Sequence, residues 1–156
     1  MDKEAFSERV RAMQGSLYRV AAGCLRGESD RLDAVSEAIT KAWAKRDTLR
    51  DERLFGTWLT RILIRECIGI QRRQKRVVPV ETMPEQARES DDRLRELREA
   101  MERLPQRQRT MVVLHYMEGY DVRETARIMG TTKGAVCAGL SRARQALRLW
   151  IEEDDQ

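Results

Sequence analysis

The chain has 156 residues, of which 41% are apolar and 36% are charged, and its net charge is only +4. This length suits one domain or two small ones. The small net charge argues against binding of polyanions through overall charge, so any basic surface must be local. Three widely separated cysteines and one histidine argue against a Cys/His metal site and a disulfide framework. We therefore expect a protein of the reducing cytoplasm that holds no metal and no cofactor. We also expect neither a signal peptide nor a membrane span.

Apolar residues recur at steps of three and four through three segments of the first half, which predicts three helices. The first covers 6–25, the second runs from about 30 to 44, and the third from about 54 to 76, where it ends in a basic cluster. Asp30 can cap the second helix, and a polar loop at 45–53 separates the second helix from the third.

The helical periodicity stops at 77–90, a segment that contains Pro79 and Pro84 and is typical of a flexible linker. A second helical unit follows it. We therefore predict an all-α fold made of two small helical domains, at 1–76 and 91–156, joined by this linker.

The second unit has the pattern of a helix-turn-helix. Two helices, at 91–104 and 106–117, come first and are separated by a proline. A capping box at 121–124 begins the next helix, Gly130 supplies a tight turn, and a threonine at 131 or 132 caps the last helix.

The last helix carries no acidic residue between 131 and 149, and its ionisable side chains are Lys133, Arg142, Arg144 and Arg148. A helix of one charge sign in a helix-turn-helix suits contact with phosphate. Alternatively, these arginines only complement the helix dipole, which fits Arg148 but fits Arg142 poorly, because Arg142 lies opposite the apolar face. The pattern therefore favours DNA binding over a purely structural hairpin.

Motifs in both halves resemble one protein family. In the first half these are DRLDAVSEA at 30–38, AW at 42–43 and FGTWLTRI at 55–62; in the second half they are LPQRQR at 104–109, EGY at 118–120 and RARQAL at 142–147. The first set resembles the second conserved region of bacterial RNA polymerase sigma factors, and the second set resembles their fourth region. Two such regions with a short linker is the layout of the extracytoplasmic-function (ECF, group IV) sigma factors, and the resemblance covers nearly the whole chain.

The resemblance implies a transcription initiation factor that binds core RNA polymerase, directs it to specific promoters and helps open the −10 element. It implies that the second-region domain docks on the clamp helices of the largest polymerase subunit and that the fourth-region domain binds the flap of the second-largest subunit. It also implies promoter DNA and an anti-sigma factor as partners. The expected location is then the cytoplasm, where an anti-sigma factor could hold the chain at the inner membrane face. The chain itself is not expected to insert into the membrane.

The expected polymerase contacts lie on the second helix: Asp30, Asp33, Glu37 and Trp43. Asp33 and Glu37 are i,i+4 neighbours, so they form an acidic ridge, although a solvated acidic face is the alternative. Ser36 stands where the family usually has glutamine.

The expected −10 contacts are basic and aromatic: Arg50, Arg53, Phe55, Trp58, Arg61, Arg65, Arg72 and Arg73. Phe55 and the loop before it lie where the family captures a flipped base, which needs stacking to offset the cost of unstacking. Trp58 is either a core residue or a second base-stacking residue. The arginines would hold backbone phosphates, a contact that salt weakens.

The expected −35 contacts are on the last helix and at its cap: Thr132, Lys133, Ala138, Ser141, Arg142, Arg144 and Gln145. Where the family commonly has GTVKSRL, this chain has GAVCAGL at 134–140, so small residues occupy 135–139 at the positions expected to read bases. Either the helix approaches the groove closely and reads shape and thymine methyls, or −35 binding is weak. We favour weak or altered recognition.

Two other functions remain open. One is a stand-alone helix-turn-helix regulator whose N-terminal half binds a partner protein, and it would bind duplex DNA without polymerase. The other is a diverged sigma-like adaptor that occupies polymerase or an anti-sigma factor without initiating transcription. An enzyme is not expected, because the sequence offers neither a recognisable nucleophile–base pair nor a glycine-rich phosphate loop.

Overall fold

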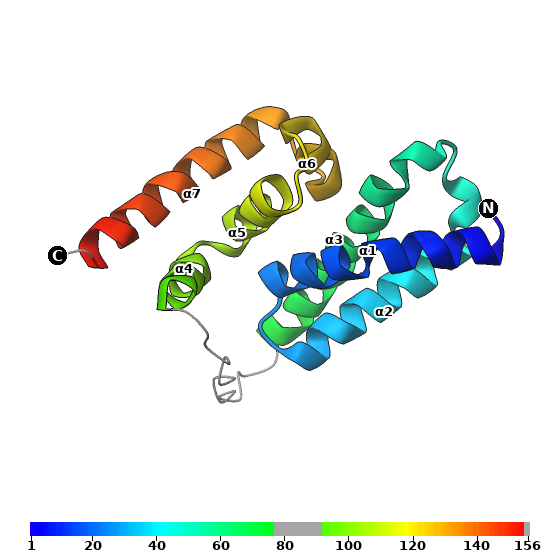
Figure 1. Cartoon of the computed structure of the whole chain (residues 1–156), viewed down its shortest axis with the longest axis horizontal. Coiled ribbons are helices and arrows are strands. Elements are labelled where there is room, and N and C mark those ends of the chain that lie inside the picture. Colours follow the sequence, from blue (N-terminus) through cyan, green and yellow to red (C-terminus); the bar gives the residue numbers. More distant parts are fainter. Residues whose placement is uncertain (77–91, 155–156) are drawn as a thin grey trace.

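A computed structural model of the chain describes residues 1–76 and 92–154. All regular elements in these residues are helical, and they form two groups (Figure 1). The predicted linker at 77–90 lies outside the described residues. Within the described part of the chain, none of the helices has both the length and the apolar character that crossing a membrane requires.

The first group consists of three helices: α1 (Lys3–Cys24), α2 (Glu28–Ala44) and α3 (Phe55–Arg76). Two short 3-10 turns, Arg46–Thr48 and Glu52–Leu54, connect α2 to α3, so part of the predicted polar loop is helical. The α1 helix starts where the Asp2 carboxylate accepts a hydrogen bond from the Ala5 backbone N–H at 2.8 Å.

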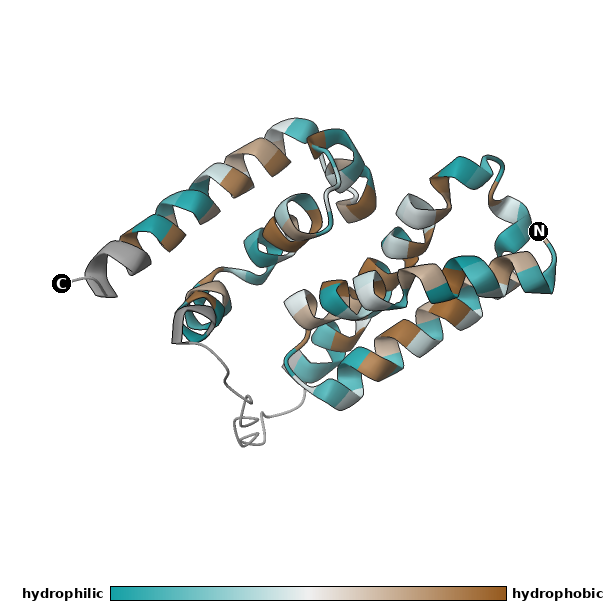
Figure 2. Cartoon of the chain, viewed as in Figure 1, coloured by the Kyte–Doolittle hydropathy of each residue, from teal (hydrophilic) through white to brown (hydrophobic). Residues whose placement is uncertain are grey.

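The inner face of α2 is made of alanines. Ala34, Ala38 and Ala42 recur every four residues and are almost completely buried. Side chains this small let α2 approach α1 and α3 closely, while larger residues of those two helices, such as Leu17, Leu59 and Leu63, fill the core. Apolar residues thus concentrate on the helix sides that face other helices (Figure 2).

The second group contains α4 (Asp92–Arg103), α5 (Gln106–Val112), a π-helical turn (Val113–Met117), α6 (Val122–Met129) and α7 (Lys133–Asp154). The predicted helix at 106–117 therefore changes to π geometry in its last turn, which apolar periodicity does not reveal.

The predicted helix-turn-helix is confirmed in its local chemistry. The Asp121 carboxylate accepts from the Glu124 N–H at 2.8 Å at the start of α6. Gly130 ends α6 in the left-handed region, at a φ of 66°. Of the two candidate threonines, Thr132 caps α7, because its hydroxyl accepts from the Ala135 N–H at 3.1 Å.

One of the two hydrophobic core clusters in the described residues includes residues of both groups. Val113, Leu114 and Ile128 of the second group belong to the same buried cluster as the core residues of α1, α2 and α3. We call the contact of α1 and α3 with α5, the π-helical turn and α6 the seam. The α7 helix lies on the far side of the second group, away from the seam (Figure 1).

Polar contacts complete the seam, and two of them come from the EGY motif. The Arg19 guanidinium donates to the Glu118 carboxylate at 2.6 Å, and the hydroxyls of Thr60 and Tyr120 are hydrogen-bonded at 3.0 Å. At Gly23, an added Cβ would lie 2.6 Å from Cγ2 of Val113, so α1 and the π-helical turn meet where α1 has no side chain. The sequence did not predict this docking.

Candidate protein and nucleic-acid interfaces

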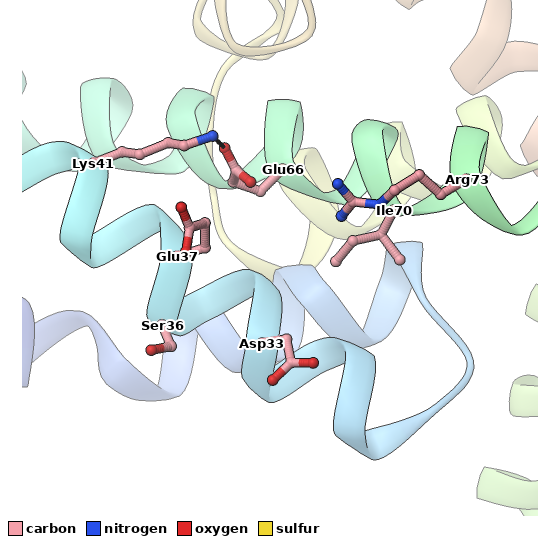
Figure 3. Close-up of a pocket in the computed structure, with 7 residues that line it drawn as sticks. All are labelled: Asp33, Ser36, Glu37, Lys41, Glu66, Ile70 and Arg73. Atoms are coloured by element: carbon pink, nitrogen blue, oxygen red, sulfur yellow. Dashed lines mark hydrogen bonds and ion pairs between the residues drawn. The ribbon is translucent and has the colours of Figure 1, made fainter.

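A groove of about 360 Å³ runs between α2 and α3 (Figure 3). Asp33, Glu37 and Lys41 recur every four residues along α2 and therefore face it together. The remaining lining residues are Ser36, Glu66, Ile70 and Arg73. Asp33 and Glu37 are exposed, so the predicted acidic ridge is present at the surface as one wall of this groove.

Glu66 joins the two walls of the groove. Its carboxylate forms an ion pair with the Lys41 ammonium, and this hydrogen bond is the main cause that raises the pKa of Lys41. Lys41 thus keeps its charge at neutral pH. A partner that approaches the groove meets the carboxylates of Asp33 and Glu37 beside this pair.

Two other predicted polymerase contacts are already engaged inside the protein. The Gln74 side chain donates to the Asp30 carboxylate, which ties the start of α2 to the end of α3. The Trp43 ring is half-buried, and the Arg46 guanidinium lies 3.8 Å from its centroid. A partner at Trp43 would therefore meet this arginine as well.

Arg73 lies apart from the other predicted DNA contacts of α3. We expected it among the DNA contacts, but it lines the acidic groove (Figure 3). Arg61, Arg65 and Arg72 lie instead on the exposed side of α3, and together with Ile68 they recur at steps of four, three and four. We call these four residues the α3 stripe.

The structure buries Phe55, which the resemblance to the family places at a flipped base. Phe55 is only 4% exposed, and its ring packs edge-on against Phe6 with centroids 5.8 Å apart. In this conformation it is a core residue. Trp58 is half-buried against the same core, with its ring centroid 5.8 Å from that of Phe55, as the core alternative for Trp58 predicted. Leu54, which is 46% exposed, is the apolar side chain that this end of α3 presents to solvent.

The loop before α3 contributes two exposed arginines. Arg50 is exposed, and Arg53 donates to the Asp51 carboxylate from its backbone and from its guanidinium, each at 3.1 Å. The hydrogen bonds from the Arg53 side chain are the main cause that lowers the pKa of Asp51. The loop therefore carries one arginine whose charge is partly compensated and a second, Arg50, beside it.

The outer face of α7 holds most of the predicted −35 contacts. Lys133, Ala138, Arg142 and Gln145 are exposed, Ser141 is half-exposed, and Thr132 is exposed at the cap. Arg144 is exposed as well, but its guanidinium donates to the Tyr116 hydroxyl at 2.7 Å. That hydrogen bond directs it along the protein surface.

One of the small residues at 135–139 does not face outward. Gly139 is buried, and a Cβ there would lie 2.3 Å from the Met111 sulfur. The expectation that the whole segment forms a bare reading face is therefore wrong at this position, where glycine lets α7 pack closely on α5. Cys137 and Ala138 are exposed, so they form the bare part of the face.

Comparison with known proteins finds one family match in each half of the chain. Residues 9–77 match the family Sigma-70 region 2, and residues 94–147 match Sigma-70, region 4. The chain is 32% identical to the RNA polymerase sigma factor SigV of Bacillus subtilis over 142 residues, which cover 88% of this chain and 86% of SigV. It is 31% identical over 154 residues to the ECF RNA polymerase sigma factor SigM of Mycobacterium tuberculosis, covering 94% of this chain and 76% of SigM.

Two solved structures share the fold. The sigma factor RpoE of Bartonella quintana, in complex with the anti-sigma factor NepR, superposes with a TM-score of 0.83 at 23% identity, over 96% of this chain and 98% of RpoE. CnrH, in complex with the cytosolic domain of CnrY, superposes with a TM-score of 0.76 at 23% identity, over 98% of this chain and 91% of CnrH. With both conserved regions in order and relatives that match over most of their length, the chain belongs to the extracytoplasmic-function sigma factors of RNA polymerase.

Proposed function

We propose that this chain is a promoter-specificity subunit, which binds core RNA polymerase, directs it to specific promoters and helps open the −10 element. The observation that carries the proposal is the ordered match of both sigma regions within one chain, at 9–77 and 94–147. A stand-alone regulator would need only the second of these regions.

We assign polymerase binding to the α2–α3 groove. Asp33 and Glu37 are exposed on one wall, so a basic surface can reach both carboxylates without any rearrangement of the fold. Complementary charge at such a surface favours fast and selective encounter. Arg73 and the Lys41–Glu66 pair would then lie at the same interface as the two acids.

We assign −10 binding to the α3 stripe and to Arg50 and Arg53 of the preceding loop. The stripe places three exposed guanidinium groups in a row along one helix face, which suits a phosphate backbone. Ile68, 39% exposed, is the one apolar residue in the row. Binding through this surface would weaken as salt concentration rises.

We assign −35 binding to the outer face of α7, with altered or weak recognition. Cys137 and Ala138 have little polar reach, so phosphate contacts from Lys133 and Arg142 would supply most of the affinity. Ala138→Arg should therefore tighten binding to −35 duplexes by about tenfold, since one good side-chain contact to a base contributes roughly 1–3 kcal/mol. Fluorescence anisotropy with the full chain measures this change.

Ala12→Arg is the control for the −35 measurement, because it adds the same charge to an exposed position of α1, far from this face. Weak recognition would be contradicted if the unmodified chain bound −35 duplexes tightly and sequence-specifically and Ala138→Arg abolished that binding.

Run-off transcription with core polymerase on a promoter library tests the proposed function. We expect transcripts only when the chain is added, from templates that share one pair of promoter elements. Polymerase binding without transcripts would instead identify the adaptor, and tight duplex binding without polymerase would identify the stand-alone regulator.

We also propose that an anti-sigma factor binds this chain. RpoE, which shares the fold, was co-crystallised with the anti-sigma factor NepR, and CnrH, which shares it too, was solved in complex with the cytosolic domain of CnrY. Because the chain acts with RNA polymerase, we place it in the cytoplasm.

A further inference from the structure

Leu54 is an apolar side chain that is exposed among charged residues. It is the last residue of the 3-10 turn before α3, and it is 46% exposed, although the next residue, Phe55, is buried. Arg50 and Arg53 of the same loop are exposed as well. A single exposed leucine is ordinary on a protein surface, so the position and the contacts of this one decide whether it has a function.

Leu54 lies in line with the α3 stripe. Trp58 precedes Arg61 by three residues, and Leu54 precedes Trp58 by four, so the spacing of the stripe continues through both into the turn. Trp58 is half-buried against the core, which leaves Leu54 as the exposed apolar side chain at this end of the row. The surface assigned to the −10 element therefore changes from arginines, which suit phosphates, to an apolar end, which does not.

The turn that carries Leu54 is held by α1. The Arg9 guanidinium donates to the Glu52 backbone carbonyl at 2.8 Å and to the Glu52 carboxylate at 3.1 Å. The same carbonyl accepts from the Phe55 backbone N–H, and Cζ of Arg9 lies 5.7 Å from the centroid of the Phe55 ring. The Leu54 N–H donates to the Asp51 carbonyl at 3.0 Å. Leu54 is thus presented on a turn that is already ordered, which lowers the entropic cost of using it in binding.

Opening of a DNA duplex gives such a side chain a task that arginines do not fulfil. Unstacking a base step costs free energy, and proteins that unstack DNA offset this cost by inserting an apolar side chain, often leucine, between the bases. Contacts to phosphates hold the duplex but carry no such preference for unstacked bases.

We propose that Leu54 is the side chain that inserts beside the first unstacked base of the −10 element, and that Arg9 is a positioning residue that holds its turn. This inference rests on the proposed role of the chain in opening the −10 element. Arg50 and Arg53 of the same loop would hold the DNA backbone while Leu54 replaces part of the lost base stacking.

The test of Leu54 uses the full chain bound to core polymerase, with 2-aminopurine in the −10 element of a promoter template. The fluorescence of this base rises when it unstacks. Leu54→Ala should slow the rise about tenfold, because the apolar contact with the base is lost, while polymerase binding stays unchanged. Leu97→Ala is the control, since Leu97 is 47% exposed on α4, and it should open the promoter like the unmodified chain.

The outcomes separate this inference from the proposed function. If the unmodified chain opens the promoter and Leu54→Ala opens it as fast as Leu97→Ala does, the role of Leu54 is overturned and the proposed function stands. If polymerase with the unmodified chain opens no promoter of the library, both are overturned.

The positioning role of Arg9 is tested by a double-mutant cycle. Arg9→Ala should slow opening about threefold in the unmodified chain, since it releases the Glu52 carbonyl and an exposed ion pair. It should have no further effect on opening in the Leu54→Ala background, because Arg9 acts through Leu54. Arg11→Ala removes an exposed arginine of the same helix and should leave opening unchanged. If Arg9→Ala slows opening equally in both backgrounds, or in neither, the positioning role is overturned.

Discussion

Asp33→Arg combined with Glu37→Arg should abolish the binding of this chain to core RNA polymerase while leaving its helices intact. The two substitutions change the groove from three acids and two bases to one acid and four bases. A basic partner surface would then meet like charge, which costs several kcal/mol, and 4 kcal/mol corresponds to an affinity loss of about a thousandfold. Titration of labelled chain with core polymerase measures the affinity, and circular dichroism measures the helix content.

Glu4→Arg with Glu8→Arg is the matched control for this variant. These two glutamates are also exposed i,i+4 neighbours, and they lie on α1, outside the groove. The control makes the same change in net charge, so it should retain polymerase binding. The assignment of the groove fails if the Asp33/Glu37 variant binds like the unmodified chain or if both variants lose binding equally.

Gly23→Leu should separate the two groups of helices. A Cβ at Gly23 already lies 2.6 Å from Val113, and the rest of a leucine side chain cannot fit while the π-helical turn stays docked on α1. The substitution does not strain α1 itself, because leucine favours a helix more than glycine does. Small-angle X-ray scattering should show a radius of gyration clearly above the roughly 15 Å expected for a compact chain of this length.

Gly69→Leu is the corresponding control on α3. A Cβ at Gly69 meets nothing within 4 Å, so the same substitution gains helix propensity without a clash. Its scattering profile should match that of the unmodified chain. If Gly23→Leu also keeps the compact scattering profile, the Val113 side chain has moved aside for the leucine. The seam then does not depend on this close approach.

Much of this architecture could be predicted from the sequence, because it depends on local patterns. Periodicity located the helices, and the cap that Asp121 forms and the turn at Gly130 have local causes that the structure confirms. The i,i+4 spacing of Asp33 and Glu37 likewise placed both on one face of α2.

The seam could not be predicted in this way. Spacing shows which side of a helix is apolar, but it does not identify the element that covers that side. Leu114 has the pattern of a core residue within its own domain, yet it packs together with Val113 into the core of α1, α2 and α3. The same limit explains Phe55 and Arg73, whose residue types suit DNA while their helix positions direct them to the core and to the groove.

The close packing of Gly139 on Met111 bears on how promoter preference can change in this lineage. An arginine at 139, common in the family, would bring its Cβ within 2.3 Å of the Met111 sulfur, so the flexible Met111 side chain must move to admit it. A shorter residue at 111 would remove this contact, and on its own it would leave a cavity beside α7. The effect of a substitution at 139 on the outer face of α7 thus depends on the side chain at 111 in the core beneath it, so the two positions are coupled.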